Sequence, residues 1–175
     1  RDAVNFAQEI YADLALGSGE GIWPHALGMA LIIAGLRLDT DSRIAGLLFA
    51  IPSRLDDGIT LLEKRFGRQV SHLVGGISRL DRLRPISRGF VADTTTNPEE
   101  MKVQIEVLRK MLLAMVEDIR VVLLRLASRT QTLRYYAQFS SDDLRTQVAR
   151  ETLELYSPLA NRLGVWELKW ELEDL

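Results

Sequence analysis

Two histidines and no cysteine set a tight limit on the metal and acid–base chemistry that this sequence can support. His25 lies at the expected start of a helix, and His72 lies inside a later one. Neither has a second histidine at a metal-ligand spacing, so each alone is more readily explained as a structural or solvent-facing residue. The lack of cysteine excludes disulfides, zinc–cysteine sites and thiol catalysis, and it fits a cytoplasmic location.

Four pairs of adjacent acidic residues could transfer protons or hold a divalent ion, but helix capping is a simpler explanation for them. These pairs are Asp56-Asp57, Glu99-Glu100, Glu117-Asp118 and Asp142-Asp143. All four fall at expected helix starts, where carboxylates cap backbone N–H groups and interact favourably with the helix dipole. The glycine-rich run at 17–21 lacks the preceding strand and the lysine of a phosphate-binding loop, so we interpret it as a connector.

Composition indicates an ordinary globular domain. Hydrophobic residues make up 47% of the 175 residues, which is enough to build a core. The formal net charge of -2 predicts no general attraction to nucleic acid or to an anionic membrane. The longest apolar stretches, such as 44–52, are far shorter than the roughly 20 residues that cross a bilayer. We therefore expect no membrane partner.

Apolar residues recur at three- and four-residue intervals, which predicts an all-α fold. The expected helices cover residues 4–16, 24–38, 42–51, 59–66, 68–83, 97–115, 119–136 and 142–156, with another beginning at 166. Asp39, Thr40 and Asp41 offer N-cap oxygens for the helix at 42–51, Asp57 and Asp118 are expected N-caps of later helices, and Gly67 is an expected C-terminal cap. The chain lacks an initiator methionine and stops within a helical pattern, so we expect an excised fragment.

Three stretches, in one order along the chain, resemble the hydrolase domain of the RelA/SpoT family. The strongest is YSPLANRLG at 156–164 with LKWELED at 168–174. The second is AMVEDIRVVLLRLASR at 114–129, and the third runs from Phe66-Gly67 to Leu80. The resemblance implies an HD-domain-like helical bundle of about 8–10 helices over residues 1–156. It also implies a linker over 157–175 that leads into a synthetase domain.

In active members of that family, the domain is a manganese-dependent hydrolase that removes pyrophosphate from the 3′ position of (p)ppGpp. A His, a His-Asp dipeptide and a later Asp hold the metal, and a Glu-Asp pair serves the attacking water. A divalent ion lowers the pKa of bound water, and carboxylates hold that ion and manage the proton. The family pattern can be placed on this sequence position by position.

By the resemblance, only one of the four metal ligands survives. His25 matches the first histidine, the dipeptide falls on Phe49-Ala50, and the last aspartate falls on Ser128. The Glu-Asp pair falls on Ser53-Arg54, where a cation would repel a metal ion. We therefore expect no metal or other cofactor in this domain, and we expect Phe49 to fill the metal position as a core residue.

RelA-type synthetases are similar to this chain at the same substituted positions. The resemblance implies a catalytically inactive, regulatory domain of a RelA-type (p)ppGpp synthetase (GTP pyrophosphokinase) in the stringent response. A following synthetase domain would use Mg²⁺ and move pyrophosphate from ATP to the 3′-hydroxyl of GDP or GTP. Two alternatives stay open. One is nucleotide binding without hydrolysis, with Arg54 and Arg129 as contacts. The other is residual hydrolysis with Asp56 or Asp57 as substitute ligands.

The C-terminal stretch suggests how such a domain would act on its neighbour. Pro158 and Gly164 interrupt the expected helices and are candidate hinges, and Trp166 and Trp170 lie on one helical face that could anchor a buried contact. The expected partner is the adjacent synthetase domain. The resemblance also allows ribosome or tRNA contact through further C-terminal domains, and a homo-oligomer.

Overall fold

The computed structural model describes residues 1–81, 117–139 and 142–175, and their regular elements are helices, as the periodicity predicted. The N-terminal helices are α1 (Asp2–Tyr11), α2 (Ile22–Gly35), α3 (Thr40–Leu47), α4 (Gly58–Phe66) and α5 (Arg68–Asp81), with a short 3₁₀ turn η1 (Ile51–Ser53). The C-terminal elements are α7 (Ile119–Phe139), α8 (Asp142–Glu151), the π-helical η3 (Thr152–Tyr156), α9 (Ser157–Arg162) and α10 (Trp166–Asp174). The helix expected at 97–115 and its caps lie outside the described residues.

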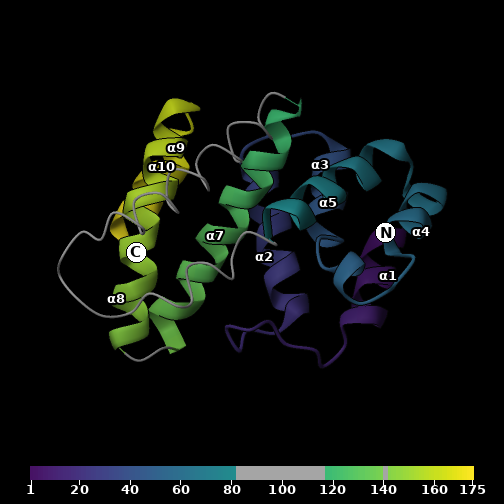
Figure 1. Cartoon of the computed structure of the whole chain (residues 1–175), viewed down its shortest axis with the longest axis horizontal. Coiled ribbons are helices and arrows are strands. Elements are labelled where there is room, and N and C mark those ends of the chain that lie inside the picture. Colours follow the sequence, from purple (N-terminus) through teal and green to yellow (C-terminus); the bar gives the residue numbers. More distant parts are fainter. Residues whose placement is uncertain (82–116, 140–141) are drawn as a thin grey trace.

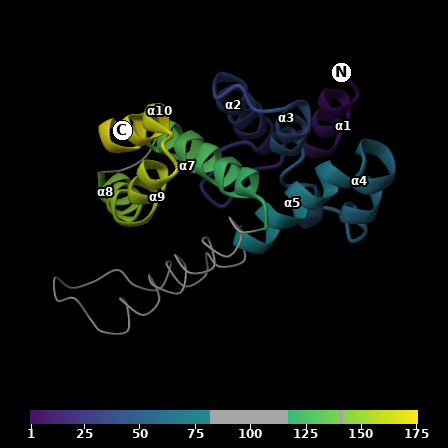
Figure 2. The same cartoon turned by 90° about the horizontal axis from the view of Figure 1, so that it is seen from above.

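Helix α7 is the central element of the arrangement. The helices α1–α5 lie on one side of it and α8–α10 on the other (Figures 1 and 2). Its apolar residues Val122, Leu124, Leu126 and Ala127 are fully buried, and α7 packs against both α2 and α10. Residues that project from α7 can therefore contact both halves of the domain.

Several helix boundaries differ from those expected. Helix α1 ends at Tyr11 instead of residue 16, because the backbone around Leu14 and Leu16 pairs with that of Glu20 and Ile22 in a small hairpin. Helix α3 ends at Leu47 instead of residue 51, and a turn and η1 with Pro52 follow. Pro52 has no N–H to donate to the Leu48 carbonyl oxygen, and its ring would clash with that carbonyl in an α-helix, which explains the early end.

The C-terminal expectations need two corrections. Pro158 does not interrupt the helical path, because it stands in the first turn of α9, directly after the π-helical η3, where a missing N–H is tolerated. Trp166 and Trp170 are 53% and 61% exposed, so the expected buried contact is not made within the described residues. The face of α10 that packs inward carries Leu168 and Leu172. Gly164 has a φ of 69° in the turn between α9 and α10, a conformation that favours glycine.

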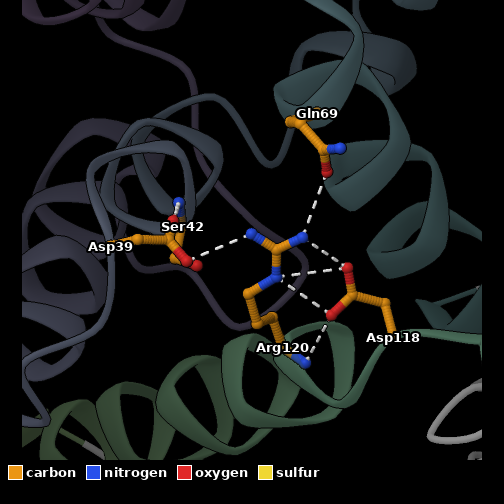
Figure 3. A network of polar contacts seen from close by, with 5 residues as sticks. All are labelled: Asp39, Ser42, Gln69, Asp118 and Arg120. Carbon is orange, nitrogen blue, oxygen red and sulfur yellow. Dashed lines mark hydrogen bonds and ion pairs between the residues drawn. The ribbon is translucent and has the colours of Figure 1, made fainter.

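Arg120 joins three helices at one point. Its guanidinium donates to the carboxylates of Asp118 and Asp39 at 2.7 and 3.1 Å, and to the amide oxygen of Gln69 at 3.1 Å (Figure 3). Asp118 also caps α7 by accepting from the Arg120 N–H at 2.9 Å, and Asp39 caps α3 by accepting from the Ser42 N–H at 2.8 Å, as predicted. The N-termini of α3, α5 and α7 are thus held together by one side chain.

This cluster predicts a loss of stability in acid. The hydrogen bond from Arg120 lowers the pKa of Asp118, and burial only partly opposes it. Burial raises the pKa of Asp39, but hydrogen bonds from Ser42 and Arg120 outweigh it and lower that pKa overall. A carboxylate whose pKa is lower in the folded state stabilises the fold above its unfolded pKa of about 4, and this stability is lost as the pH falls through the folded value.

We therefore expect Arg120→Ala to lower the free energy of unfolding at pH 7 by about 1–3 kcal/mol, and to reduce the further loss seen at pH 3. Urea unfolding at both pH values measures the two effects. Arg79→Ala is the control, because the pair of Arg79 with Glu117 is exposed on both sides. Equal acid sensitivity in the Arg120→Ala variant and the unchanged chain would contradict this assignment.

Candidate functional site

His25 lies in the first turn of α2 and is buried together with Glu20 from the preceding loop. His25 Nδ1 is 2.7 Å from Glu20 Oε2, and His25 Nε2 is 3.0 Å from Ser128 Oγ on α7. A carboxylate only accepts, so Nδ1–H donates to Glu20, and the serine hydroxyl can serve either protonation state of Nε2. Both ring nitrogens therefore already have partners.

The same carboxylate binds a second residue of α7. Gln131 Nε2 donates to Glu20 Oε1 at 2.7 Å. Ser128 and Gln131 are one turn apart on α7, so they reach the Glu20–His25 pair from the same helical face. Glu20, His25, Ser128 and Gln131 form one network, which we call the His25 network. It joins α2, α7 and the loop between α1 and α2.

The turn after α3 covers the imidazole with an aromatic ring. Phe49 is 7% exposed, and its ring centroid lies 5.2 Å from that of His25 and 6.4 Å from that of Tyr11. The Ala50 N–H donates to the Tyr11 hydroxyl at 3.1 Å, and burial raises the pKa of Tyr11. The expected burial of Phe49 in the core is confirmed, and its apolar ring lies against the His25 imidazole.

The positions matched to the Glu-Asp pair lie at the protein surface. Ser53 Oγ donates to the Ala50 carbonyl oxygen at 2.7 Å, so its hydroxyl is used within η1. Arg54 is exposed, and its guanidinium makes a long hydrogen bond of 3.4 Å to the Ala15 carbonyl oxygen. Neither side chain supplies a carboxylate next to His25.

Arg129 is buried and binds the C-terminal elements. Its guanidinium donates to Thr152 Oγ1 at 2.8 Å, to the Val148 carbonyl oxygen at 2.7 Å and to Glu151 Oε2 at 2.8 Å. These contacts fully account for a guanidinium that is 2% exposed. Arg129 therefore joins α7 to α8 and η3. Its surroundings do not support the expected contact with a nucleotide.

The donors around His25 do not fit a manganese ion. Manganese prefers oxygen ligands with imidazole, whereas this site offers an imidazole whose two nitrogens have partners, a phenyl ring, a serine hydroxyl and one carboxylate, that of Glu20, which is bonded to His25 and Gln131. Among the described residues, no three His, Asp or Glu side chains are grouped so as to hold a metal ion. Asp56 and Asp57 are exposed at the start of α4. No step of a metal-dependent reaction can be derived from these residues.

Sequence reasoning missed Glu20, Gln131 and Tyr11. Glu20 stands in the glycine-rich run that we interpreted as a connector, and its burial depends on the hairpin that brings residues 14–16 next to 20–22. A signal was present, since an acidic residue five positions before a histidine is close enough to pair with it. Gln131 and Tyr11 lie on helices whose inward faces only the tertiary fold defines.

Gly28 gives this network its space, which leads to a stability prediction. A Cβ at Gly28 would lie 2.1 Å from Gln131 Oε1, so Gly28→Ala should displace Gln131 from Glu20. Loss of the Gln131–Glu20 hydrogen bond should lower the free energy of unfolding by about 1–3 kcal/mol. The higher helix propensity of alanine should offset up to about 1 kcal/mol of this loss. Urea unfolding is the measurement. Gly35→Ala in the same helix meets nothing within 4 Å and is the matched control; a Gly28→Ala variant as stable as that control would refute the prediction.

Comparisons with known proteins identify a matching family and several relatives of this chain. The HD domain family matches residues 3–166. The chain is 37% identical over 175 residues to the bifunctional (p)ppGpp synthase/hydrolase SpoT of Escherichia coli K12, covering all of this chain and 23% of that protein. It is 36% identical over 178 residues to a GTP pyrophosphokinase of Myxococcus xanthus, covering 100% of this chain and 22% of that protein.

A solved structure described as a metazoan orthologue of SpoT that hydrolyses ppGpp has the same fold. It matches with a TM-score of 0.62 at 18% identity, covering 99% of this chain and 90% of the other. The chain therefore spans less than a quarter of the length of the curated relatives above, and nearly all of the metazoan chain. No helix in the described ranges is long and apolar enough to cross a membrane.

Proposed function

This chain belongs to the RelA/SpoT family as its HD domain, and from that premise we propose that it is a hydrolase-like domain that has lost hydrolysis and regulates a neighbouring (p)ppGpp synthetase domain. Overall similarity does not decide between activities, since the identities to the SpoT protein and to the pyrophosphokinase are 37% and 36%. The side chains around His25 do distinguish an active hydrolase from an inactive one, and the proposal rests on them.

The single observation behind the loss of hydrolysis is the convergence of substituted positions on His25. Ser128 is distant in the sequence, yet its hydroxyl bonds His25, and the Phe49 ring lies against the same imidazole. These positions meet in space, as the ligands of one metal would. Because they carry a hydroxyl and a phenyl ring, and the carboxylate of Glu20 is bonded to His25 and Gln131, we infer that the site has lost the donors that would hold a metal ion.

Calorimetry on the 175-residue chain tests this part of the proposal. We expect no heat of binding for Mn²⁺ at micromolar concentration, and no release of pyrophosphate from (p)ppGpp in its presence. Turnover that Mn²⁺ stimulates would refute the loss of hydrolysis. Binding of (p)ppGpp without turnover would favour the nucleotide-binding alternative. Of the two arginines expected for that alternative, only the exposed Arg54 would be available.

The regulatory part rests on how α7 connects the His25 network to the C-terminal helices. Arg125 and Arg129 follow one another at a four-residue spacing on α7, and both guanidinium groups lie over the Tyr156 ring, at 5.6 and 4.8 Å from its centroid. Arg125 also donates to the Tyr156 hydroxyl at 3.0 Å. Further along α7, Arg134 pairs with Glu171 of α10 at 2.5 Å. Movement of α7 would therefore move α10.

The exposed rings of α10 offer a surface for the neighbouring domain. Trp166 and Trp170 project away from Leu168 and Leu172, so they are free to contact a following domain. Gly164, in the turn between α9 and α10, is the proposed hinge, whereas Pro158 lies within the continuous helical path at the start of α9. In the longer protein, we expect Trp166→Ala, Gly164→Pro and deletion of residues 1–150 to change the synthetase rate or its response to activators. Unchanged rates and responses in all three would leave the domain as a scaffold only.

A further inference from the structure

A cavity lies between η1, α4 and α5, away from the His25 network. Its volume is about 380 Å³, within the range of pockets that hold small ligands. Pro52 and Ile59 form an apolar wall, and Arg68, His72 and Arg79 line the side made by α5. The cavity thus combines an apolar surface with basic side chains.

The basic residues share one face of α5. Arg68, His72, Gly75 and Arg79 follow one another at spacings of four, three and four residues, which places them on one helical stripe. The Arg79 side chain leans back along the helix, so that its NH1 atom would be 3.7 Å from a Cβ at Gly75. The guanidinium therefore lies beside the space that Gly75 leaves open.

These cations are weakly engaged by the protein itself. The partner of Arg79 is Glu117, at 3.4 Å, and both side chains are about 60% exposed, so the pair is weak. Arg68 has no ion pair or hydrogen bond from its side chain within the described parts of the chain. Among the described residues, the cavity is lined by two guanidinium groups, the His72 imidazole and the Ser71 and Ser78 hydroxyls, against one carboxylate, that of Glu63.

Neither the backbone conformation nor close packing requires a glycine at position 75. Its φ is not positive, and a Cβ there would meet Ile59 at 3.6 Å and Arg79 at 3.7 Å, which are ordinary van der Waals contacts. The next residue differs, because a Cβ at Gly76 would lie 2.6 Å from Val121 and block the contact of α5 with α7. Glycine in a helix interior is less favourable than alanine. What Gly75 provides is the open space of the cavity.

We propose that this cavity binds a small organic phosphate, with its phosphate on Arg79 and His72 and its apolar part against Ile59 and Pro52. Guanidinium groups bind phosphate oxygens in a bidentate manner, and an imidazole and a hydroxyl can donate to the remaining oxygens. An inorganic anion alone would leave the apolar wall unused. This site is independent of the His25 network and of the proposed loss of hydrolysis.

Titration of the 175-residue chain with phenyl phosphate, followed by the amide NMR shifts of α5, tests the proposal. We expect saturable binding that weakens at least tenfold in Arg79→Gln, and that tightens in Glu63→Gln, where a repelling charge is removed. Gly75→Ala should weaken binding several-fold, while the midpoint of thermal unfolding stays the same or rises. Phenol, which has no phosphate, should bind far more weakly.

Arg43→Gln serves as the control, because Arg43 is an exposed arginine on α3 outside this cavity. It should bind phenyl phosphate as the unchanged chain does. The proposal is overturned if phenyl phosphate does not saturate at millimolar concentration. It is also overturned if Arg79→Gln and Gly75→Ala bind as tightly as the unchanged chain, or if Arg43→Gln weakens binding as much as Arg79→Gln.

Discussion

Three substitutions, Phe49→His, Ala50→Asp and Ser128→Asp, are expected to raise the affinity of this chain for Mn²⁺ on the order of 100-fold or more. The reason is that the proposed loss of a metal site implies that its backbone positions are still assembled around His25. Ser128 Oγ lies 3.0 Å from His25 Nε2, and the Phe49 ring centroid lies 5.2 Å from that of His25. New imidazole and carboxylate donors at these positions would face one another without a change of fold.

Isothermal calorimetry with Mn²⁺ measures this effect, and circular dichroism checks that the variant stays helical. The control adds His25→Ala to the three substitutions, which should abolish the gained affinity. A folded triple variant that binds Mn²⁺ no better than the unchanged chain would show that the family's ligand positions have been placed on the wrong residues here. Adding Ser53→Glu and Arg54→Asp should then allow hydrolysis of (p)ppGpp, which the triple variant alone should lack.

The parts of this structure that the sequence predicted well are those that depend on neighbouring residues. Asp39 and Asp118 cap their helices as expected, because an N-cap needs only a side-chain oxygen and the next turn of backbone. Gly67 ends α4 with a φ of 93°, as expected from its position after a helical pattern. Such features require no knowledge of the tertiary fold.

The parts that depend on distant residues were predicted only through the family resemblance, or not at all. The contact of His25 with Ser128 joins residues 103 positions apart, and no local pattern points to it. Trp166 and Trp170 were correctly placed on one helical face, but the sequence did not reveal that Leu168 and Leu172 would take the inward side of α10. Arg129 was a plausible surface arginine until the fold placed Glu151 and Thr152 beside it.

The burial of Phe49 leads to the second large effect. Phe49→Ala is expected to lower the free energy of unfolding by about 3–5 kcal/mol, the usual range for removing a buried phenyl ring. The ring packs between His25 and Tyr11, both of which are held by hydrogen bonds and cannot easily move into the space. Urea unfolding with a shared m-value measures the loss, and Leu31→Ala, at a residue that is 64% exposed, should change stability by less than about 0.5 kcal/mol.

This stability prediction also bears on the proposed loss of the metal. A domain whose core is completed by a metal ion loses stability when a chelator removes it, because binding free energy contributes to folding. Under the proposed loss of the metal, the Phe49 ring takes the place of a ligand, so packing should hold α2, α7 and the turn after α3 together without an ion. The unfolding midpoint of the unchanged chain should therefore be the same with and without EDTA, while Phe49→Ala lowers it under both conditions. If EDTA lowers the midpoint of the unchanged chain, or if Phe49→Ala costs less than about 1 kcal/mol against the 3–5 expected of a buried ring, then Phe49 does not replace a metal in the core.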